Sequence, residues 1–359
     1  MYLDNTNSIK GIFVWLIVFC HKTKYIIKRD YLFINICGNL GQQVVSMFFF
    51  YSGYGIFESF KKKGHVYIKT LPKKGFILFM KAQIVNLSIL LIYKFFFNIK
   101  ITIKKYLLSI IFKTSLEYSN WFPFTIILFY NYSFISFNSV ENKYFLGIII
   151  ITLICFSHIF YVYNYYYPKA LYSVDTVFSF VIGLYYSFFK KIIDKIIIKS
   201  DIYYFFIVSA LITFYSKVFI YHNLINLSAR NSCFSLLVVL ISMKIKFNNE
   251  FLLFLNSHSY SIYLLHRIVI SFVKRKNYLN NCEFIKISFE FTFIFFLSSL
   301  FDKYTIFMNR LINIKLKQLK NNNNYITSRF YVFSNIIEKN SDDNNFKLKQ
   351  IFNNKKSYI

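Results

Sequence analysis

Long apolar runs alternate with short clusters of lysine and asparagine along most of the chain. Most of these runs have about the 20 residues that a helix needs to cross the hydrocarbon core of a bilayer. The charged residues gather at the ends of the runs, as they do in the loops of multi-pass membrane proteins. The pattern predicts an all-α fold, a polytopic integral membrane helical bundle of about ten transmembrane helices.

Two of the predicted spans are unusual. The first has only about a dozen apolar residues and is marginal as a span on its own. The second carries two glycines and two glutamines in its first half, which should face protein rather than lipid. The segments 98–119 and 304–316 are amphipathic and are not counted as membrane spans. The ten predicted spans are 9–21, 31–57, 75–97, 120–137, 144–163, 172–189, 202–221, 224–243, 251–273 and 283–301.

The C-terminal end of the chain differs in composition from the rest. From Lys320 onward, asparagine-rich polar runs show little apolar periodicity, which is typical of segments that cannot form a packed core. We therefore expect a membrane domain over residues 1–318 and a polar, Asn/Lys-rich, disordered cytoplasmic tail over 319–359.

The predicted topology follows from the number of spans and from the basic residues. An even number of spans places both termini on one side of the membrane. The lysines and arginines of the loops divide almost equally between the two sides, and those that follow the last span favour the cytoplasm for both termini. The first apolar run is followed by His-Lys-Thr-Lys rather than by a small-residue cleavage site, so no cleaved signal peptide is expected. We expect a multi-pass protein of the plasma membrane.

Composition narrows the function classes. The net charge of +28 suggests a nucleic-acid partner at first. The lysines lie at the ends of apolar runs rather than along one amphipathic face, so no nucleic-acid partner is expected. The five cysteines are scattered, with neither a CxxC motif nor a His/Cys cluster. This spacing predicts neither a disulfide framework nor a metal site.

The first apolar run carries Lys10 near its start and His21 at its far end. Lys10 and His21 are eleven positions apart, which is about three helical turns. Both side chains therefore lie on one stripe of the helix, about 16 Å apart. His21 has two interpretations: a helix-end residue at the membrane interface, or a neutral general base that accepts a proton from a hydroxyl. Lys10 has a structural interpretation as the cytoplasmic anchor of the helix.

Further motifs follow His21 in a fixed order. Each motif alone is a weak indication of function. Their order and spacing together make a chance combination improbable. They are the phenylalanine-rich stretch from Met47 through Ser52, Gly53 and Tyr54 to Gly55, the basic loop from Tyr67 to Lys74, Asn120 with Trp121, and the segment from Ser259 to His266.

Together with Lys10 and His21, these motifs resemble the acyltransferase 3 family of membrane acyltransferases over about residues 4–302. That family includes polysaccharide and lipopolysaccharide O-acetyltransferases. The resemblance implies transfer of an acyl group, most simply acetyl, from an acyl-CoA to a hydroxyl of a cell-surface glycan or lipid-linked sugar. Acyl-CoA would be the donor substrate, and no cofactor would stay bound.

The resemblance also implies roles for individual residues. His21 would be the general base, and the acyl-donor-binding residues would be Lys10, Lys69, Lys73 and Lys74. The family usually carries a pair of arginines at the third-helix entry, where this chain has lysines. Lysine is a point charge and cannot bind a phosphate in the bidentate manner of arginine. The residues expected to line or support the reaction channel are Ser52, Gly53, Tyr54, Trp121, Ser259, Tyr263 and His266.

Several of these residues have a second interpretation. Ser52 could be a covalent acyl acceptor or a small-residue packing position. Ser259, Tyr263 and His266 share one helical face, which could simply line the bundle interior. Three acids, Glu58, Asp175 and Glu290, lie in or at the ends of spans, and any of them could orient His21.

Two alternatives to an active acyltransferase remain open. One is a transporter or flippase of an acyl group or a lipid-linked sugar. The other is a catalytically degenerate homologue, which the lysine-for-arginine replacement keeps open. The sequence does not indicate the acceptor, the acyl chain length or the oligomeric state.

Overall fold

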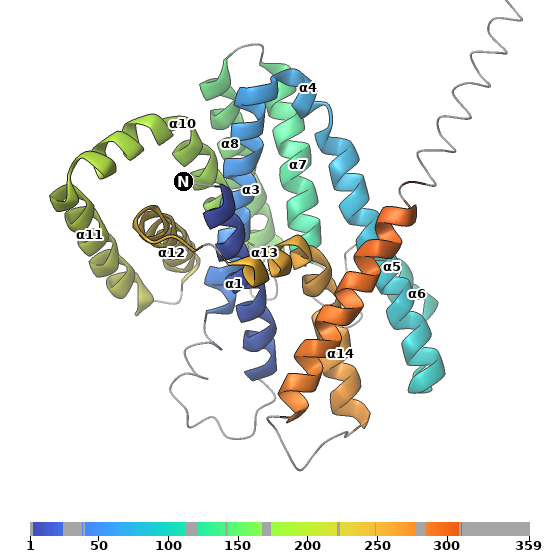
Figure 1. The fold of residues 1–359 in the computed structure, drawn as a ribbon. Coiled ribbons are helices and arrows are strands. Elements are labelled where there is room, and N and C mark those ends of the chain that lie inside the picture. The colour runs from blue at the N-terminus through green and yellow to red at the C-terminus, as the bar shows by residue number, and fades with distance from the viewer. Residues whose placement is uncertain are drawn as a thin grey trace, which may run out of the picture. The chain divides into compact units, whose positions relative to one another are not determined.

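The computed structural model describes residues 3–23, 38, 40–111, 121–140, 143–166, 174–220, 223–247, 249–276, 285–308 and 310. Within these segments every regular element is a helix, which confirms the predicted all-α class (Figure 1). The chain divides into two compact units, Met1–Ser299 and Leu300–Ile359. All contacts described below lie within the first unit. The predicted tail, 319–359, lies outside the described residues.

The bounds of the helices are α1 Leu3–Thr23, α3 Gly41–Lys63, α4 His65–Ile68, α5 Leu71–Phe96, α6 Ile103–Ile110, α7 Trp121–Ser139, α8 Tyr144–Tyr166, α10 Val177–Lys199, α11 Asp201–Phe219, α12 Leu224–Lys244, α13 Glu250–Ser257 and α14 Ser259–Lys276. Residues 285–299 are also helical.

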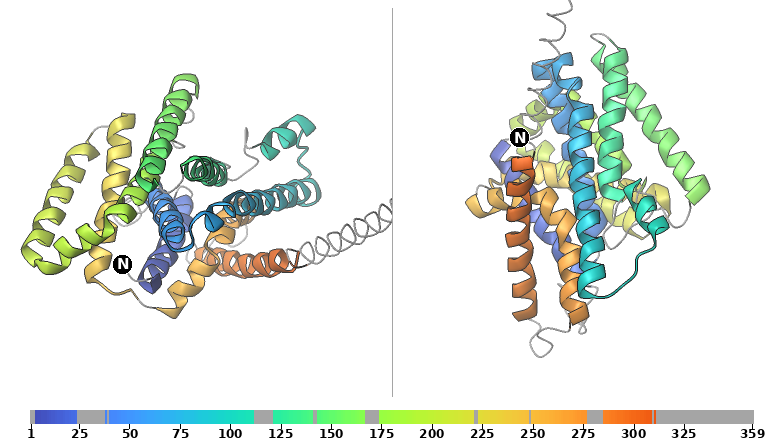
Figure 2. Two further views of the ribbon diagram at one scale, coloured as in Figure 1. Left: turned by 90° about the horizontal axis from the view of Figure 1, so that it is seen from above. Right: turned by 90° about the vertical axis from the view of Figure 1, so that its right-hand side faces the viewer.

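Four helical segments of the described chain are long and apolar enough to cross a membrane. They coincide with the spans predicted at 75–97, 144–163, 202–221 and 224–243. Helix α11 leaves many large apolar side chains exposed, among them Ile202, Phe205 and Phe206. In Figures 1 and 2 it stands at the edge of the bundle. An apolar surface of this extent suits lipid rather than water. The four segments are His65–Phe96, Tyr144–Tyr165, Asp201–Phe219 and Leu224–Lys244.

The prediction of one continuous span over 251–273 is wrong. The segment is broken at His258 into α13, which lies across the bundle, and α14, which runs along it (Figure 1). The bend allows two different contacts. The backbone of Leu252 in α13 packs against Gly11 of α1, while the hydroxyl of Tyr260 in α14 donates to the carbonyl oxygen of Leu78 in α5 at 2.9 Å.

Two other helix boundaries differ from their predicted positions. The loop expected after residue 189 is helical, because α10 continues to Lys199 with isoleucines repeating at helical spacing between its lysines. Helix α1 begins at Leu3 rather than near residue 9. Its 21 residues extend about 30 Å, which matches the thickness of a hydrocarbon core. Its first turns are polar, however, and α1 is not among the four described segments that are long and apolar enough to cross a membrane.

The core around α1 is built from residues at helical spacing. Val14 and Val18 are one turn apart on α1 and pack into one buried cluster with residues of α13, α14 and the helical segment 285–299. The ring of Trp15 lies 4.9 Å from that of Phe291, measured between centroids. This packing determines how α1 is rotated, and so where its polar residues point.

Helices α3 and α10 approach each other at a reciprocal pair of glycines. A side chain added at Gly53 would collide with the backbone of Phe180 and Leu184. One added at Gly183 would collide with the backbone of Phe50 and Tyr54. Small residues at such positions let two helix backbones pack closely, which assigns Gly53 a packing role.

We predict that Gly53→Ala destabilises the protein whereas Gly55→Ala, two positions along the same helix, does not. The added methyl of Gly53→Ala must push two helix backbones apart, at a cost of about 1–3 kcal/mol. A methyl at Gly55 meets no atom within 4 Å, and alanine is favoured over glycine inside a helix. Thermal unfolding of the detergent-solubilised variants measures the stability of each. Equal melting temperatures for the two variants would contradict the α3–α10 packing.

Candidate functional site

Two histidines and an arginine meet where α1 packs against α14. His21 lies in the last turn of α1, and His266 and Arg267 are neighbours in α14. The imidazole rings of His21 and His266 are stacked, with centroids 4.9 Å apart and planes at 26°. Nη2 of Arg267 lies 3.1 Å from Nδ1 of His21 and 3.4 Å from its Nε2. The structure thus brings together two histidines that the sequence predicted separately.

The hydrogen bonds of this cluster determine which ring nitrogen of His266 carries the proton. A guanidinium can only donate, and Nη2 of Arg267 lies within 3.4 Å of both ring nitrogens of His21, so this contact is compatible with either neutral tautomer of His21. Nδ1 of His266 lies 2.7 Å from the carbonyl oxygen of Tyr263 and 3.2 Å from that of Ile262. Carbonyls only accept, so this Nδ1 is protonated and Nε2 of His266 carries the lone pair. That Nε2 is buried and has no hydrogen-bond partner among the described residues.

Arg267 was not among the predicted site residues. One signal could have indicated it: a cation directly after a histidine, within a predicted membrane span, is costly unless it has a partner. Its partner, His21, is far away in the sequence. The contact therefore depends on how α1 and α14 are rotated against each other, which one-dimensional spacing does not give.

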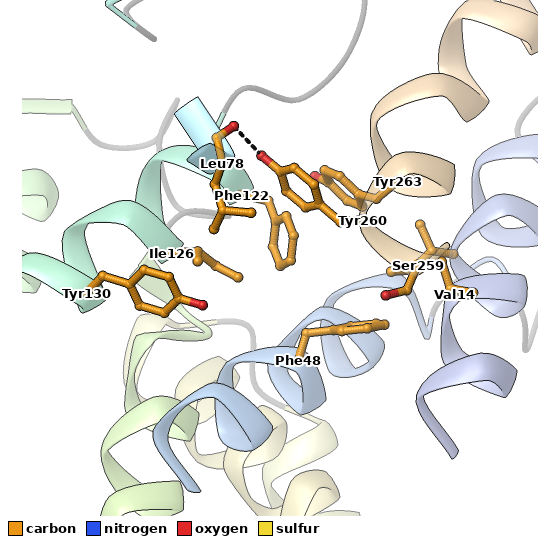
Figure 3. Close-up of a pocket in the computed structure, with 10 residues that line it drawn as sticks. Val14, Phe48, Leu78, Phe122, Ile126, Tyr130, Ser259, Tyr260 and Tyr263 are labelled. Carbon is orange, nitrogen blue, oxygen red and sulfur yellow. Dashed lines mark hydrogen bonds between the residues drawn. The ribbon is translucent and has the colours of Figure 1, made fainter. Parts of the chain in front are cut away.

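A cavity of about 180 Å³ lies among α1, α3, α5, α7 and α14. The residues of the cluster do not line it, but the ring of Tyr263, which does, lies 5.7 Å from that of His266, measured between centroids. The predicted residues Ser259 and Tyr263 line the cavity. Figure 3 shows the hydroxyls of Ser259 and Tyr130 pointing into the space from opposite sides. Ile17 also lines the cavity, and His21 follows it by one helical turn. The histidine cluster therefore lies just beyond one end of this cavity.

The predicted basic residues lie beyond the other end. Lys69, in the turn between α4 and α5, and Lys73 and Lys74, in the first turn of α5, are exposed. Nζ of Lys74 lies 4.0 Å from the centroid of the Tyr67 ring. Leu78, one turn after Lys74, lines the cavity and is bonded to Tyr260 of α14. The rise from Lys74 to Leu78 along α5 and the rise from Tyr260 to His266 along α14 add up to about 15 Å.

Lys10, predicted to hold the donor, lies inside the bundle. Its Nζ is 5.1 Å from the centroid of the Tyr51 ring on α3. The neighbouring Tyr54 accepts a hydrogen bond of 3.0 Å from Lys190 of α10. Lys10 and Tyr54 therefore belong to a layer of cations and tyrosines between α1, α3 and α10.

The remaining predicted channel residues act in packing. The hydroxyl of Ser52 donates to the carbonyl oxygen of Phe48, one turn earlier in its own helix, at 2.8 Å. The indole of Trp121 packs edge-on against Phe49, at 82°. These contacts support the α3–α7 wall of the cavity, since Phe48 lines the cavity itself.

Two of the three acids, Glu290 and Glu58, have side-chain partners, whereas Oδ1 of Asp175 is buried without a hydrogen-bond partner among the described residues. Glu290 forms a buried ion pair with Lys22, with Nζ to Oε distances of 2.6 and 2.7 Å. Glu58 accepts from Lys61 and from Ser187. The backbone carbonyl of Asp175 accepts from Asn231. Glu290 thus fixes the residue next to His21, and Lys22, expected in a loop, is buried.

Comparison with known proteins gives no relative to guide the interpretation. No family model matches the chain, and neither a curated protein nor a solved structure matches it. Among the described residues, no group of three or more His, Cys, Asp or Glu side chains is arranged to hold a metal ion. The functional argument therefore depends on the geometry alone.

We predict that Glu290→Gln destabilises the protein by about 3–5 kcal/mol, because it leaves Lys22 charged and buried without its partner. The double variant Lys22→Met/Glu290→Leu should recover most of this loss, since it removes both charges together. The control is Asp201→Asn, which breaks the exposed pair with Lys244 and should cost less than about 1 kcal/mol. Unfolding of the four proteins in detergent compares these free energies. A Glu290→Gln effect no larger than that of Asp201→Asn would contradict the buried pair.

Proposed function

We propose that this protein is an integral membrane acyltransferase of the acyltransferase 3 type, with about ten transmembrane helices in the plasma membrane and both termini in the cytoplasm. It transfers an acyl group, most simply acetyl, from an acyl-CoA to a hydroxyl of a cell-surface glycan or lipid-linked sugar. The observation that carries the proposal is the contact of His21, His266 and Arg267 beside a cavity.

The donor would enter from the basic turn. Lys69, Lys73 and Lys74 are exposed there, where they can bind the phosphates of coenzyme A as point charges. The separation of about 15 Å between this turn and His266, counted along the helices, is comparable with an extended phosphopantetheine arm. The cavity lies between the two, so the thioester would reach the histidine cluster through it.

The chemistry follows from the groups of the cluster. Arg267 turns from Nδ1 of His21 to the thioester carbonyl oxygen, where negative charge develops in the transition state. Nδ1 of His21 is then available to accept the proton of the acceptor hydroxyl. The hydroxyl oxygen forms the new C–O bond, and the C–S bond breaks. The thiolate of coenzyme A leaves and takes the proton from His21.

One observation favours a second assignment of the base. In the observed arrangement, Nε2 of His266 has a lone pair and no hydrogen-bond partner among the described residues, whereas Nδ1 of His21 faces Arg267. His266 could accept the proton without any movement of Arg267. Substitution of each histidine separately distinguishes the two assignments.

The cavity of about 180 Å³ suits the narrow chain of an acyl thioester, while the acceptor would present only its hydroxyl there. The transporter alternative is tested by ester formation, which a transporter would not catalyse. The degenerate-homologue alternative is tested by the wild-type protein itself, which would then form no ester.

We predict that His21→Ala lowers the ester content of surface glycans by about 100-fold or more, the loss expected when a general base is removed. The measurement compares glycans from cells that express each variant at equal membrane abundance. His158→Gln is the control, because His158 lies outside the cluster and bonds to Tyr132. It should leave the ester content unchanged.

His266→Ala completes the test of the base. If His21 is the base, His266→Ala retains more ester than His21→Ala, and the opposite order assigns the proton to His266. Unchanged ester in both variants would contradict the site. Wild-type cells with no more ester than cells without the protein would support the degenerate homologue.

A further inference from the structure

A second cavity, of about 280 Å³, lies among α10, α11 and α12. Apart from Tyr186 its lining is entirely aliphatic, and includes Ile193 and Ile197 of α10, Leu211 of α11 and Val239 of α12. A cavity with such walls does not hold water, and it accepts hydrocarbon. None of these residues belongs to the acyl-transfer site proposed above.

A basic cleft of about 560 Å³ adjoins this cavity. Lys191 and Lys195, one turn apart on α10, line the cleft together with Ser200. Ile196 forms part of the wall of both spaces. The aliphatic cavity and the cationic cleft are therefore neighbours, separated by the side of one helix.

The position of the two spaces suits a lipid. Helix α11 stands at the edge of the bundle (Figures 1 and 2) and exposes large apolar side chains next to the cavity wall. Lys61, at the basic end of α3, donates to the carbonyl oxygen of Ser187 in α10. The cleft therefore lies near the Lys61–Lys63 end of the bundle. Lysines at the end of a membrane bundle attract anionic lipid headgroups.

We propose that the α10–α11–α12 cavity and its basic cleft bind an anionic phospholipid of the bilayer. One acyl chain fills the aliphatic cavity, and the phosphate lies against Lys191 and Lys195. The inner wall of the cavity, Tyr186, packs against the rings of Phe50 and Tyr54 of α3, with centroids 5.6 and 5.9 Å apart. The bound chain therefore supports the α3–α10 packing. This site is independent of the proposed acyl transfer.

The test uses the full-length protein, purified in detergent and titrated separately with phosphatidylglycerol, phosphatidylcholine or an isoprenoid phosphate. Native mass spectrometry counts the lipid that each variant retains. Leu211→Trp fills the cavity, and its control is Ile212→Trp, the next position of α11, which is exposed. Lys191→Gln/Lys195→Gln removes the charges of the cleft, and its control is Lys62→Gln/Lys63→Gln, an exposed pair at the end of α3.

The wild-type protein should retain phosphatidylglycerol in preference to phosphatidylcholine, and Leu211→Trp should lose that lipid while Ile212→Trp keeps it. Lys191→Gln/Lys195→Gln should reduce the preference by about 30-fold, the combined effect expected of two lysines at an anionic surface. Unchanged retention in either the cavity or the cleft variant would overturn the proposal. Stronger retention of an isoprenoid phosphate than of phosphatidylglycerol would show that the occupant is of another class.

Discussion

The close packing of α1 against α13 and α14 determines the geometry of the candidate site. Gly11 allows the backbone of Leu252 to lie directly on α1, and Val14 and Val18 pack into the cluster formed with α13, α14 and residues 285–299. With α1 held in this rotation, His21 faces α14 at the level of His266 and Arg267. The buried Lys22–Glu290 pair holds the same end of α1 against residues 285–299.

This packing has a chemical consequence for the histidines. Two carbonyls next to Nδ1 of His266 leave the lone pair of that ring on Nε2, and the guanidinium of Arg267 lies against both ring nitrogens of His21. A general base must begin the reaction with such a lone pair. The cluster therefore provides one unpartnered proton acceptor, Nε2 of His266, and a permanent positive charge in contact with a second histidine. This combination suits an ester-forming step in which negative charge develops on a carbonyl oxygen.

Much of the fold could be predicted from apolar periodicity, and less of the site. The lengths of the apolar runs predicted the helical segments that became α5, α8, α11 and α12, because membrane helices are recognised by composition alone. The bend at His258 was missed, although the polar residues from Asn256 to Ser259 interrupt the apolar run at that point. His21 and His266 were predicted, but Arg267 and the burial of Lys22 were not. Both depend on helix rotation rather than on spacing along the chain.

The central claim is that His21 and Arg267 act as one unit in the ester-forming step, His21 as the base and Arg267 at the carbonyl oxygen. A double-mutant cycle on the rate of ester formation tests it directly, with His21→Ala, Arg267→Gln and the double variant, each shown by size-exclusion chromatography to be folded. Catalytic residues that act as a unit are non-additive, so the double variant should be no slower than the slower single variant, within about twofold. Losses that multiply in the double variant would show that the two residues act independently and would contradict the account.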